Sequence, residues 1–430
     1  MEVLLLGTGS PGGWPQPGCS CASCACAAER RLSRAPTSAL VDDVLLLDPT
    51  PEVVRQAAGS GRVLSRVATV LLSGKGDLQP VASQLSALTT DGPVEVLGPE
   101  PALEPYVGYP RFRPMAATAG DVFRRDQYVL RAVAQGAGIS WDLSSSSGAR
   151  LLYAPGAAVV ESTVVEDGTG WYDVVLLGGG SATVVGQSLA GLRRSGSVTD
   201  AADIIVVDIG HAYGHPDALA ELLPSWGART VLDGTCVHVG SDPTGARRPA
   251  SLRGRTLVLG GVRSGKSALA EQLLAAQPSV TYVATGGARD EDAEWRERVA
   301  AHVARRPASW RTIETNDVAE CLATADTPLL IDCLGTWLTS RLDHHGVWDG
   351  GALDPVEADV AELVLAWRSA TVPVVAVSNE VGSGVVPATA SGRLFRDLLG
   401  RLNATLAAES ETVLLTVAGV PLPLRVRTIT

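Results

Sequence analysis

One stretch decides the fold of the C-terminal part of this 430-residue chain: Gly260-Gly261-Val262-Arg263-Ser264-Gly265-Lys266-Ser267. It fits the phosphate-binding pattern G-x-x-x-x-G-K-[ST] at every position. A strand-like apolar run, Thr256–Leu259, precedes it, and a run with helical pattern, Ser267–Ala276, follows it. In this context the loop amides and the helix N-terminus bind phosphate, so we expect a nucleotide here. Lys266 would hold the β- and γ-phosphates, and Ser267 would be a ligand of Mg²⁺.

The residues beyond this loop alternate between short apolar runs and longer segments with helical pattern. Strands are predicted at Val280–Ala284, Leu329–Ile331, Val374–Val377 and Val413–Val417, and helices at Asp292–Ala304 and Gly392–Ala408. These connections are long enough for crossover helices, so residues 255–430 are predicted to form an α/β domain with a covered parallel sheet. Asp332 ends one of these strands and is the expected second carboxylate for Mg²⁺, although a strand-end Asp can also be a simple cap.

The N-terminal part has a different pattern. Residues 242–254 are polar and rich in Pro, Gly and Arg, which is typical of a linker. Before them, residues 1–241 contain many short apolar runs, such as Val94–Leu97 and Ile204–Val207, between clusters of Gly, Pro and Ser. Helical pattern is sparse there, with Pro216–Leu223 as the main case. We therefore predict a β-rich α/β sandwich for residues 1–241.

The composition narrows the classes of partner. Asp and Glu number 46 against 35 Lys and Arg, which gives a formal net charge of −11. Because nucleic acids and anionic membranes attract basic proteins, we expect neither as a partner. No apolar run approaches the roughly 20 residues that span a bilayer, and no signal-peptide pattern is present, so a cytoplasmic protein without membrane insertion is expected. Seven cysteines in a chain of this size do not resemble a disulfide framework.

Further motifs follow the phosphate loop in a characteristic order. Three of them are Arg298-Val299-Ala300-Ala301-His302, Asp332-Cys333-Leu334 and Ser378-Asn379-Glu380-Val381-Gly382. From about Arg255 to Arg425 the succession resembles the bifunctional adenosylcobinamide kinase/adenosylcobinamide-phosphate guanylyltransferase family of cobalamin biosynthesis. The resemblance implies that ATP or GTP, with Mg²⁺, phosphorylates adenosylcobinamide. GTP then transfers GMP to that phosphate, which gives adenosylcobinamide-GDP and pyrophosphate. It also implies a homo-oligomer.

The same resemblance implies the residues of the site. His302 would carry GMP from GTP to the acceptor, and a neutral imidazole can attack phosphorus in this way. Neighbouring arginines could neutralise phosphate charge there; the alternative for His302 is a solvated surface residue. Besides the phosphate loop, the implied nucleotide contacts are Thr285, Gly286, Gly287, Val303, Ala304, Arg305, Arg306, Glu314 and Asp332. Glu380 could orient the substrate hydroxyl or cap a strand end.

The start of the chain resembles a second family. Leu4–Pro11 and the stretch Gly18-Cys19-Ser20-Cys21-Ala22-Ser23-Cys24 resemble the opening of phosphodiesterases with the metallo-β-lactamase fold, an αββα sandwich. In these, a C-x-C-x-x-C cluster and the second histidine of a T-H-x-x-H-like segment hold a structural zinc. The resemblance implies Cys19, Cys21, Cys24 and His238 as zinc ligands, with Gly234 where a catalytic histidine would stand. A reduced cysteine cluster without metal is the alternative. His211 and His215 are expected to be ordinary surface or capping residues.

The catalytic signature of that fold, H-x-H-x-D-H, is missing. After the predicted strand Ala68–Leu72 the chain reads Ser73-Gly74-Lys75-Gly76-Asp77-Leu78, and no histidine precedes Gly210. Lys75 would repel a cation at this place. We expect a degenerate hydrolase domain. For the whole chain, the alternatives are another P-loop kinase of small metabolites, or a regulatory P-loop module attached to a metal-dependent hydrolase.

Overall fold

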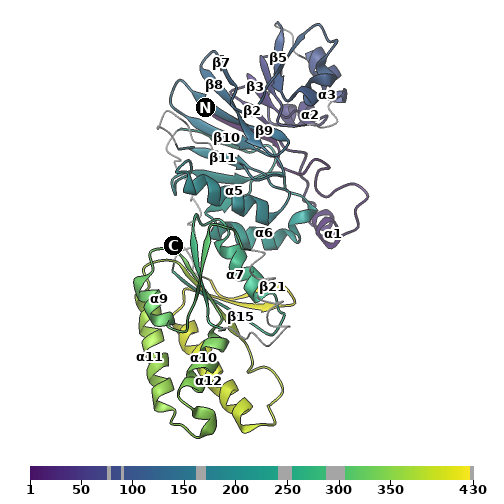
Figure 1. Ribbon diagram of the computed structural model, residues 1–430. Coiled ribbons are helices and arrows are strands. Elements are labelled where there is room, and N and C mark those ends of the chain that lie inside the picture. Colours follow the sequence, from purple (N-terminus) through teal and green to yellow (C-terminus); the bar gives the residue numbers. More distant parts are fainter. Residues whose placement is uncertain (75–78, 89–91, 161–170, 241–253, 287–305, 427–430) are drawn as a thin grey trace. The chain divides into compact units, whose positions relative to one another are not determined.

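The computed structural model describes residues 1–430 except 75–78, 89–91, 161–170, 241–253, 287–305 and 427–430. The chain divides into two compact units, Met1–Ser251 and Leu252–Thr430 (Figure 1). The division falls inside the segment 242–254, of which Gly254 alone is described. Among the described residues, no helix combines the length and the apolar character that crossing a membrane requires.

The N-terminal unit contains two seven-stranded sheets. The strands of the first sheet are, in spatial order, β14 (Cys236–His238), β1 (Glu2–Gly7), β2 (Ser38–Val41), β3 (Leu45–Leu47), β4 (Thr69–Leu71), β5 (Val94–Gly98) and β6 (Phe112–Ala116). Those of the second are β13 (Ala228–Arg229), β12 (Asp203–Val206), β11 (Val174–Leu177), β10 (Arg150–Ala154), β9 (Gly138–Ser145), β8 (Tyr128–Gln135) and β7 (Val122–Arg125). Each sheet is antiparallel over one half and parallel over the other.

A buried apolar core lies between these sheets. Leu5 and Leu47 of the first sheet share one buried cluster with Trp141 and Leu151 of the second. Because side chains alternate across a strand, the opposite face of the first sheet is also apolar. That face packs against α2 (Val53–Gly59) and α3 (Gln79–Leu88). Figure 1 shows α5 (Ala182–Arg194) and α6 (Pro216–Leu222) along the second sheet, so the predicted αββα sandwich is confirmed.

The expectation of sparse helices in this unit was wrong. The structure also contains α1 (Ala22–Glu29), α2, α3, α4 (Glu100–Leu103) and α5. Helix α5 buries Gly186, Ser188 and Ala190 against its surroundings. Val185, Leu189 and Leu192 are buried on the same helix at helical spacing, and the glycine and serine between them weaken that pattern in the sequence.

The C-terminal unit is built on one sheet of seven strands. In spatial order they are β17 (Trp310–Glu314), β16 (Val280–Ala284), β18 (Leu329–Asp332), β19 (Val374–Asn379), β15 (Arg255–Gly260), β20 (Thr412–Val417) and β21 (Val420–Arg425). All neighbours are parallel except the β20–β21 hairpin. The predicted parallel-sheet class is therefore confirmed. The edge strands β17 and β21 were not predicted, because their exposed side chains give little apolar signal.

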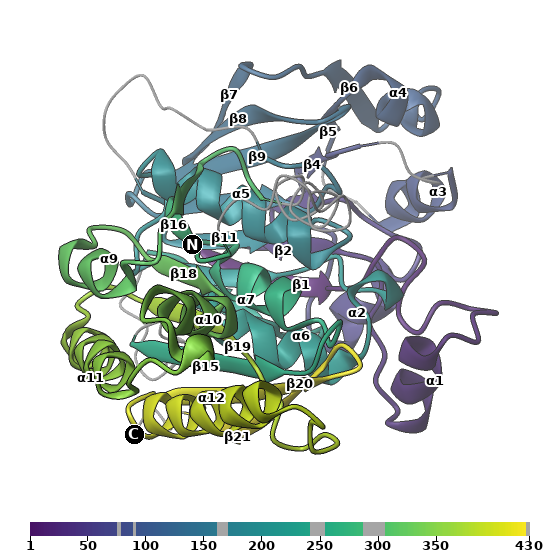
Figure 2. The same ribbon diagram turned by 60° about the horizontal axis from the view of Figure 1, so that its bottom comes forward.

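Helices cover this sheet. They are α7 (Lys266–Leu274), α9 (Val318–Thr324), α10 (Leu334–His344), α11 (Asp354–Ser369) and α12 (Ala390–Ala408). Leu257 and Leu259 of the interior strand β15 belong to the same buried cluster as Trp337 of α10, Trp367 of α11 and Leu402 of α12. Figure 2 shows α10, α11 and α12 gathered on one side of the unit. The predicted helix Asp292–Ala304 lies outside the described residues.

Arg255 and Glu411 connect the start of β15 to the segment between α12 and β20. The Arg255 backbone N–H donates to Glu411 Oε2 at 2.7 Å, and the guanidinium donates to Oε1 at 2.6 Å and to Oε2 at 3.2 Å. Burial alone would raise the pKa of Glu411, but the side-chain and backbone hydrogen bonds from Arg255 outweigh burial and lower this pKa to about 2. The ionised carboxylate therefore stabilises the unit.

We expect Glu411→Gln to lower the free energy of unfolding of the C-terminal unit at neutral pH by about 2 kcal/mol. A carboxylate with a depressed folded-state pKa contributes fully above its ordinary pKa of 4.5, and the contribution is lost as the pH falls towards 2. Urea titrations at neutral pH and near pH 3.5 should show the difference between wild type and variant shrinking. The control is Glu409→Gln, which removes the exposed pair with Arg368; an equal loss in both variants would contradict the assignment.

Candidate functional site

The loop between β15 and α7 has the backbone that its sequence demands. Gly265 has a φ of 94°, in the left-handed region that favours glycine. At Gly260 a Cβ atom would lie 2.4 Å from Ser264 Oγ and 2.7 Å from the Thr416 carbonyl oxygen. The Lys266 ammonium donates to the Gly261 carbonyl at 3.1 Å, so it lies over the loop. Both fixed glycines and the lysine thus shape a phosphate cradle at the N-terminus of α7.

Polar side chains meet at the same edge of the sheet, where the parallel strands end. Ala284, the last residue of β16, is in register with Glu314 on one side and Asp332 on the other. The strand between Asp332 and the phosphate loop is β19. It leads to Glu380, whose backbone N–H donates to the Gly260 carbonyl at 3.1 Å. Glu380 is therefore one strand closer to the loop than Asp332, and its carboxylate accepts from the Gly382 N–H at 2.7 Å.

Tyr282 connects two of the predicted site residues. Its hydroxyl donates to Asp332 Oδ2 at 2.7 Å, and the guanidinium carbon of Arg306 lies 3.3 Å from the centre of its ring. Tyr282 is buried, and burial together with the negative charge of Asp332 raises its pKa well above the ordinary range, so the hydroxyl keeps its proton. Tyr282 was not among the predicted site residues, although a tyrosine two residues before the end of a predicted strand was a usable signal.

Thr285 is another predicted nucleotide contact that the structure describes. Thr285 is buried, and its hydroxyl accepts from the Cys333 N–H at 3.0 Å and donates to the Cys333 carbonyl at 2.7 Å. Its side chain thus holds the turn from β18 to α10, and its backbone N–H donates to the Asp332 carbonyl at 3.3 Å. Outside the described residues lie His302, Gly287, Val303, Ala304 and Arg305.

The N-terminal unit brings three cysteines to a histidine. The ends of β1 and β12 are joined by hydrogen bonds from the Ser10 N–H to the Ile209 carbonyl, 2.9 Å, and from the Ile209 N–H to the Thr8 carbonyl, 3.0 Å. The segments that follow both strands therefore lie together. His211 Nδ1 is 3.3 Å from Cys19 Sγ and 3.7 Å from Cys24 Sγ. The ligand atoms of Cys19, Cys21, Cys24 and His211 all lie within 4.8 Å of one another.

The assignment of His238 to this cluster was wrong; His211, which we expected to be a surface or capping residue, is exposed and lies beside the cysteines. His238 pairs with Glu2 at the start of β1, whereas the cysteines follow the end of β1, so the length of the strand separates them. His238 groups instead with Glu2 and Cys236. The residue three positions before His211 is Asp208.

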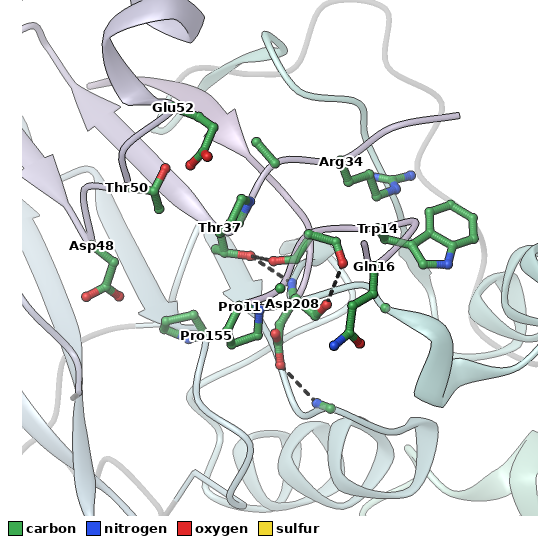
Figure 3. Close-up of a pocket in the computed structure, with 18 of the residues that line it drawn as sticks. Pro11, Trp14, Gln16, Arg34, Thr37, Asp48, Thr50, Glu52, Pro155 and Asp208 are labelled. Atoms are coloured by element: carbon green, nitrogen blue, oxygen red, sulfur yellow. Dashed lines mark hydrogen bonds between the residues drawn. The ribbon is translucent and has the colours of Figure 1, made fainter. Parts of the chain in front are cut away.

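Asp208 lies in a cavity of about 1180 Å³ formed by loops at the strand ends of the N-terminal unit (Figure 3). Burial raises the pKa of Asp208 to about 7, although the Gly179 and Gly180 N–H groups bind its carboxylate. Asp48, in the same cavity, accepts hydrogen bonds from the backbone N–H and the hydroxyl of Ser73. Among the described residues, neither aspartate belongs to a group of metal-ligating side chains. These side chains do not fit a dinuclear metal centre; Lys75 and Asp77 lie outside the described residues.

Comparison with known proteins connects each unit to relatives. The family model for cobinamide kinase/cobinamide phosphate guanyltransferase matches residues 256–424. A bifunctional adenosylcobalamin biosynthesis protein of Pseudomonas aeruginosa is 43% identical over 178 residues, which are 40% of this chain and 97% of that protein.

Similar solved structures include two that each cover 55% of this chain. Zn²⁺-bound PqqB from Methylobacterium extorquens matches over 100% of its length with 18% identity and a TM-score of 0.42. The metallo-β-lactamase fold protein YhfI from Bacillus subtilis matches over 98% of its length with 12% identity and a TM-score of 0.38. The C-terminal unit has the phosphate loop with polar side chains at the neighbouring strand ends, and it matches nearly the whole length of the Pseudomonas protein. The chain therefore belongs to the cobinamide kinase/cobinamide phosphate guanyltransferase family.

Proposed function

We propose that the C-terminal unit phosphorylates the aminopropanol hydroxyl of adenosylcobinamide with ATP or GTP and then transfers GMP from GTP to that phosphate. The phosphate loop at residues 260–267 carries this proposal, because its glycine backbone and Lys266 form a triphosphate cradle in a chain of this family. The products are adenosylcobinamide-GDP and pyrophosphate. The setting is the cytoplasm, and the protein is a homo-oligomer, as the resemblance implies.

The residues around the loop fit a magnesium ion. Mg²⁺ prefers oxygen ligands and keeps several waters. The Ser267 hydroxyl in the first turn of α7 and the Asp332 carboxylate at the same sheet edge offer such oxygens. Bound Mg²⁺ supplies neutralisation of charge on the phosphates. The contribution of the chain is to fix the phosphates through the loop amides and Lys266, and to keep Asp332 in place through Tyr282.

The transfer of GMP requires a nucleophile, and we propose His302, which lies outside the described residues. Its imidazole nitrogen attacks the α-phosphorus of GTP, the bond to the β-phosphate oxygen breaks, and pyrophosphate leaves. The phosphate of adenosylcobinamide phosphate then attacks the same phosphorus, and the P–N bond breaks to release the histidine. Two displacements replace one difficult step. Arg306 is the described residue nearest in sequence, and its guanidinium can neutralise the phosphates.

With GTP labelled at the α-phosphate, the wild-type chain should acquire a protein-bound label that acid removes and alkali does not, as expected of a P–N bond. His302→Ala should reduce labelling and GMP transfer by at least about 100-fold while phosphorylation of adenosylcobinamide continues. His344→Ala, an exposed histidine of α10, is the matched control and should label normally. An unlabelled wild type that still phosphorylates a small metabolite would identify a plain kinase instead.

Tyr282→Phe should raise the KM for GTP about tenfold with little change in kcat. The variant keeps the ring beneath Arg306 and removes only the hydrogen bond to Asp332, worth roughly 1.4 kcal/mol for a bond to a charged group. Steady-state kinetics of GMP transfer measures the effect. Tyr282→Leu removes the ring as well and should be more severely impaired; a Phe variant indistinguishable from wild type would show that Asp332 needs no support from Tyr282.

We further propose that the cysteine cluster of the N-terminal unit holds a structural zinc ion. Three thiols and one imidazole are the donor set of closed, tetrahedral zinc sites. Cys19, Cys21, Cys24 and His211 offer this set within 4.8 Å, and they come from two distant parts of the chain. Bound zinc supplies a cross-link here rather than chemistry, because all four positions of a tetrahedral site are filled by the protein.

Metal analysis of the purified chain should find one zinc ion per molecule that remains through dialysis. His211→Ala should lose it, since three thiolates alone bind less tightly, and should also lower the melting temperature of the N-terminal unit. His238→Ala is the matched control and should retain full zinc content. If the zinc followed His238 and not His211, the cluster found in the structure would not be the metal site.

A further inference from the structure

The peptide unit between Asn379 and Glu380 is held on both sides at the edge of the C-terminal sheet. Its N–H group, which belongs to Glu380, donates to the Gly260 carbonyl at 3.1 Å. Its carbonyl group, which belongs to Asn379, accepts from Asn403 Nδ2 at 3.0 Å. Because a peptide unit is planar, these two hydrogen bonds fix the direction in which the chain leaves β19. The Cα atom of Glu380 is therefore held beside the first residue of the phosphate loop.

Asn403 interrupts an otherwise apolar face of α12. The buried residues of this helix are three leucines and one amide, namely Leu399, Leu402, Leu406 and Asn403. Asparagine forms helices weakly, and a buried amide without partners is costly. Asn403, which is 4% exposed, has partners at both ends, since its Oδ1 atom accepts from the buried Ser378 hydroxyl at 2.6 Å. Its place in the helix is therefore explained by its hydrogen bonds to the end of β19 and not by packing.

Glu380 offers a carboxylate oxygen to a ligand. The side chain is half-exposed, and its Oε1 atom accepts from the Gly382 N–H at 2.7 Å. This bond orients the carboxylate, and in the described part of the chain no ion pair engages Glu380. The strand on the other side of β15 is β20, and it leads to Val417, Ala418 and Gly419, which carry no carboxyl group. Of the two strands that flank the phosphate-loop strand, β19 alone leads directly to a carboxylate.

We propose that Glu380 binds the aminopropanol hydroxyl of adenosylcobinamide during its phosphorylation and accepts its proton, and that Asn403 positions Glu380. The inference rests on the proposed function, because that function supplies the hydroxyl. The hydroxyl oxygen attacks the γ-phosphorus of the nucleotide, and the new P–O bond replaces the bond to the β-phosphate oxygen. The nucleoside diphosphate leaves, and the hydroxyl proton passes to the Glu380 carboxylate and then to water. A carboxylate that orients the acceptor hydroxyl beside the transferred phosphate has this role in protein kinases.

The two reactions of the C-terminal unit differ in their need for such a carboxylate. Phosphorylation uses a hydroxyl, which has to lose its proton as the new bond forms. GMP transfer uses the phosphate of adenosylcobinamide phosphate, which is already ionised near neutral pH. Loss of the Glu380 carboxylate should therefore impair the first reaction and spare the second.

Glu380→Gln keeps the size of the side chain and should lower kcat for phosphorylation of adenosylcobinamide about 100-fold, with little change in the KM for the nucleotide. Protein labelling by GTP labelled at the α-phosphate should continue at the wild-type rate. So should GMP transfer to adenosylcobinamide phosphate that is supplied directly. Steady-state kinetics of the two reactions on the full-length chain measures the difference.

Asn403→Leu completes the apolar face of α12, removes both hydrogen bonds and should lower kcat for phosphorylation about tenfold. The matched control is Leu406→Ala, which destabilises the same helix through a cavity and leaves the hydrogen bonds of Asn403 in place. It should phosphorylate at the wild-type rate at a temperature where it is folded. Combined with Glu380→Gln, Asn403→Leu should lower kcat no further, because the group that Asn403 positions is already lost.

A Glu380→Gln variant that phosphorylates as fast as wild type would overturn the inference. So would a variant that loses protein labelling as severely as phosphorylation, since the carboxylate would then serve the nucleotide and not the hydroxyl. Effects of Glu380→Gln and Asn403→Leu that multiply would remove the positioning role of Asn403. These three results leave the proposed function intact, because the wild type still performs both reactions. A wild type that labels with GTP and phosphorylates no corrinoid would remove the kinase part of that function together with this inference.

Discussion

Both units depend on one constraint of parallel sheets: the carboxyl ends of parallel strands come out at a common edge. In the C-terminal unit this edge gathers the phosphate loop after β15, Asp332 at the end of β18 and Glu380 after β19. In the N-terminal unit it gathers Asp48 after β3, Ser73 after β4 and Asp208 after β12. Residues far apart in sequence become neighbours because buried strands between them pair in register. The apolar cores therefore hold these loops together at one edge of each sheet.

The sequence predicted best what is local. The phosphate loop was recognised because its glycines have short-range reasons: Gly265 needs a left-handed backbone, and Gly260 lies against Ser264 and Thr416. The sandwich and the parallel sheet followed from the spacing of apolar runs. Tyr282 was missed because its role appears only when β16 and β18 lie side by side. Helix α5 was missed although Val185, Leu189 and Leu192 are buried at helical spacing, because the glycine and serine between them weaken the helical pattern.

The error over His238 has the same origin on a larger scale. His211 follows strand β12 and His238 ends strand β14. No local sequence pattern shows which of these two strands ends near the cysteines. Pairing separates the two histidines: β14 pairs with the start of β1, whereas the segment after β12 bridges the segment after β1 through Ile209 and Gly9. Three positions before His211 is Asp208, which lines the cavity of this unit.

The cysteine cluster has a mechanical consequence for the N-terminal unit. Cys19 and His211 are 192 residues apart in the chain, so a metal ion between them closes a loop that contains most of both sheets. By chain-entropy arguments, a cross-link over a loop of this length removes unfolded-state freedom worth on the order of 5 kcal/mol. Unlike a disulfide, this closure needs no oxidant and is reversed by a chelator. The same ion would thus set how cooperatively the two sheets unfold. Because the cross-link contains no disulfide, a reducing compartment would leave the cross-link intact.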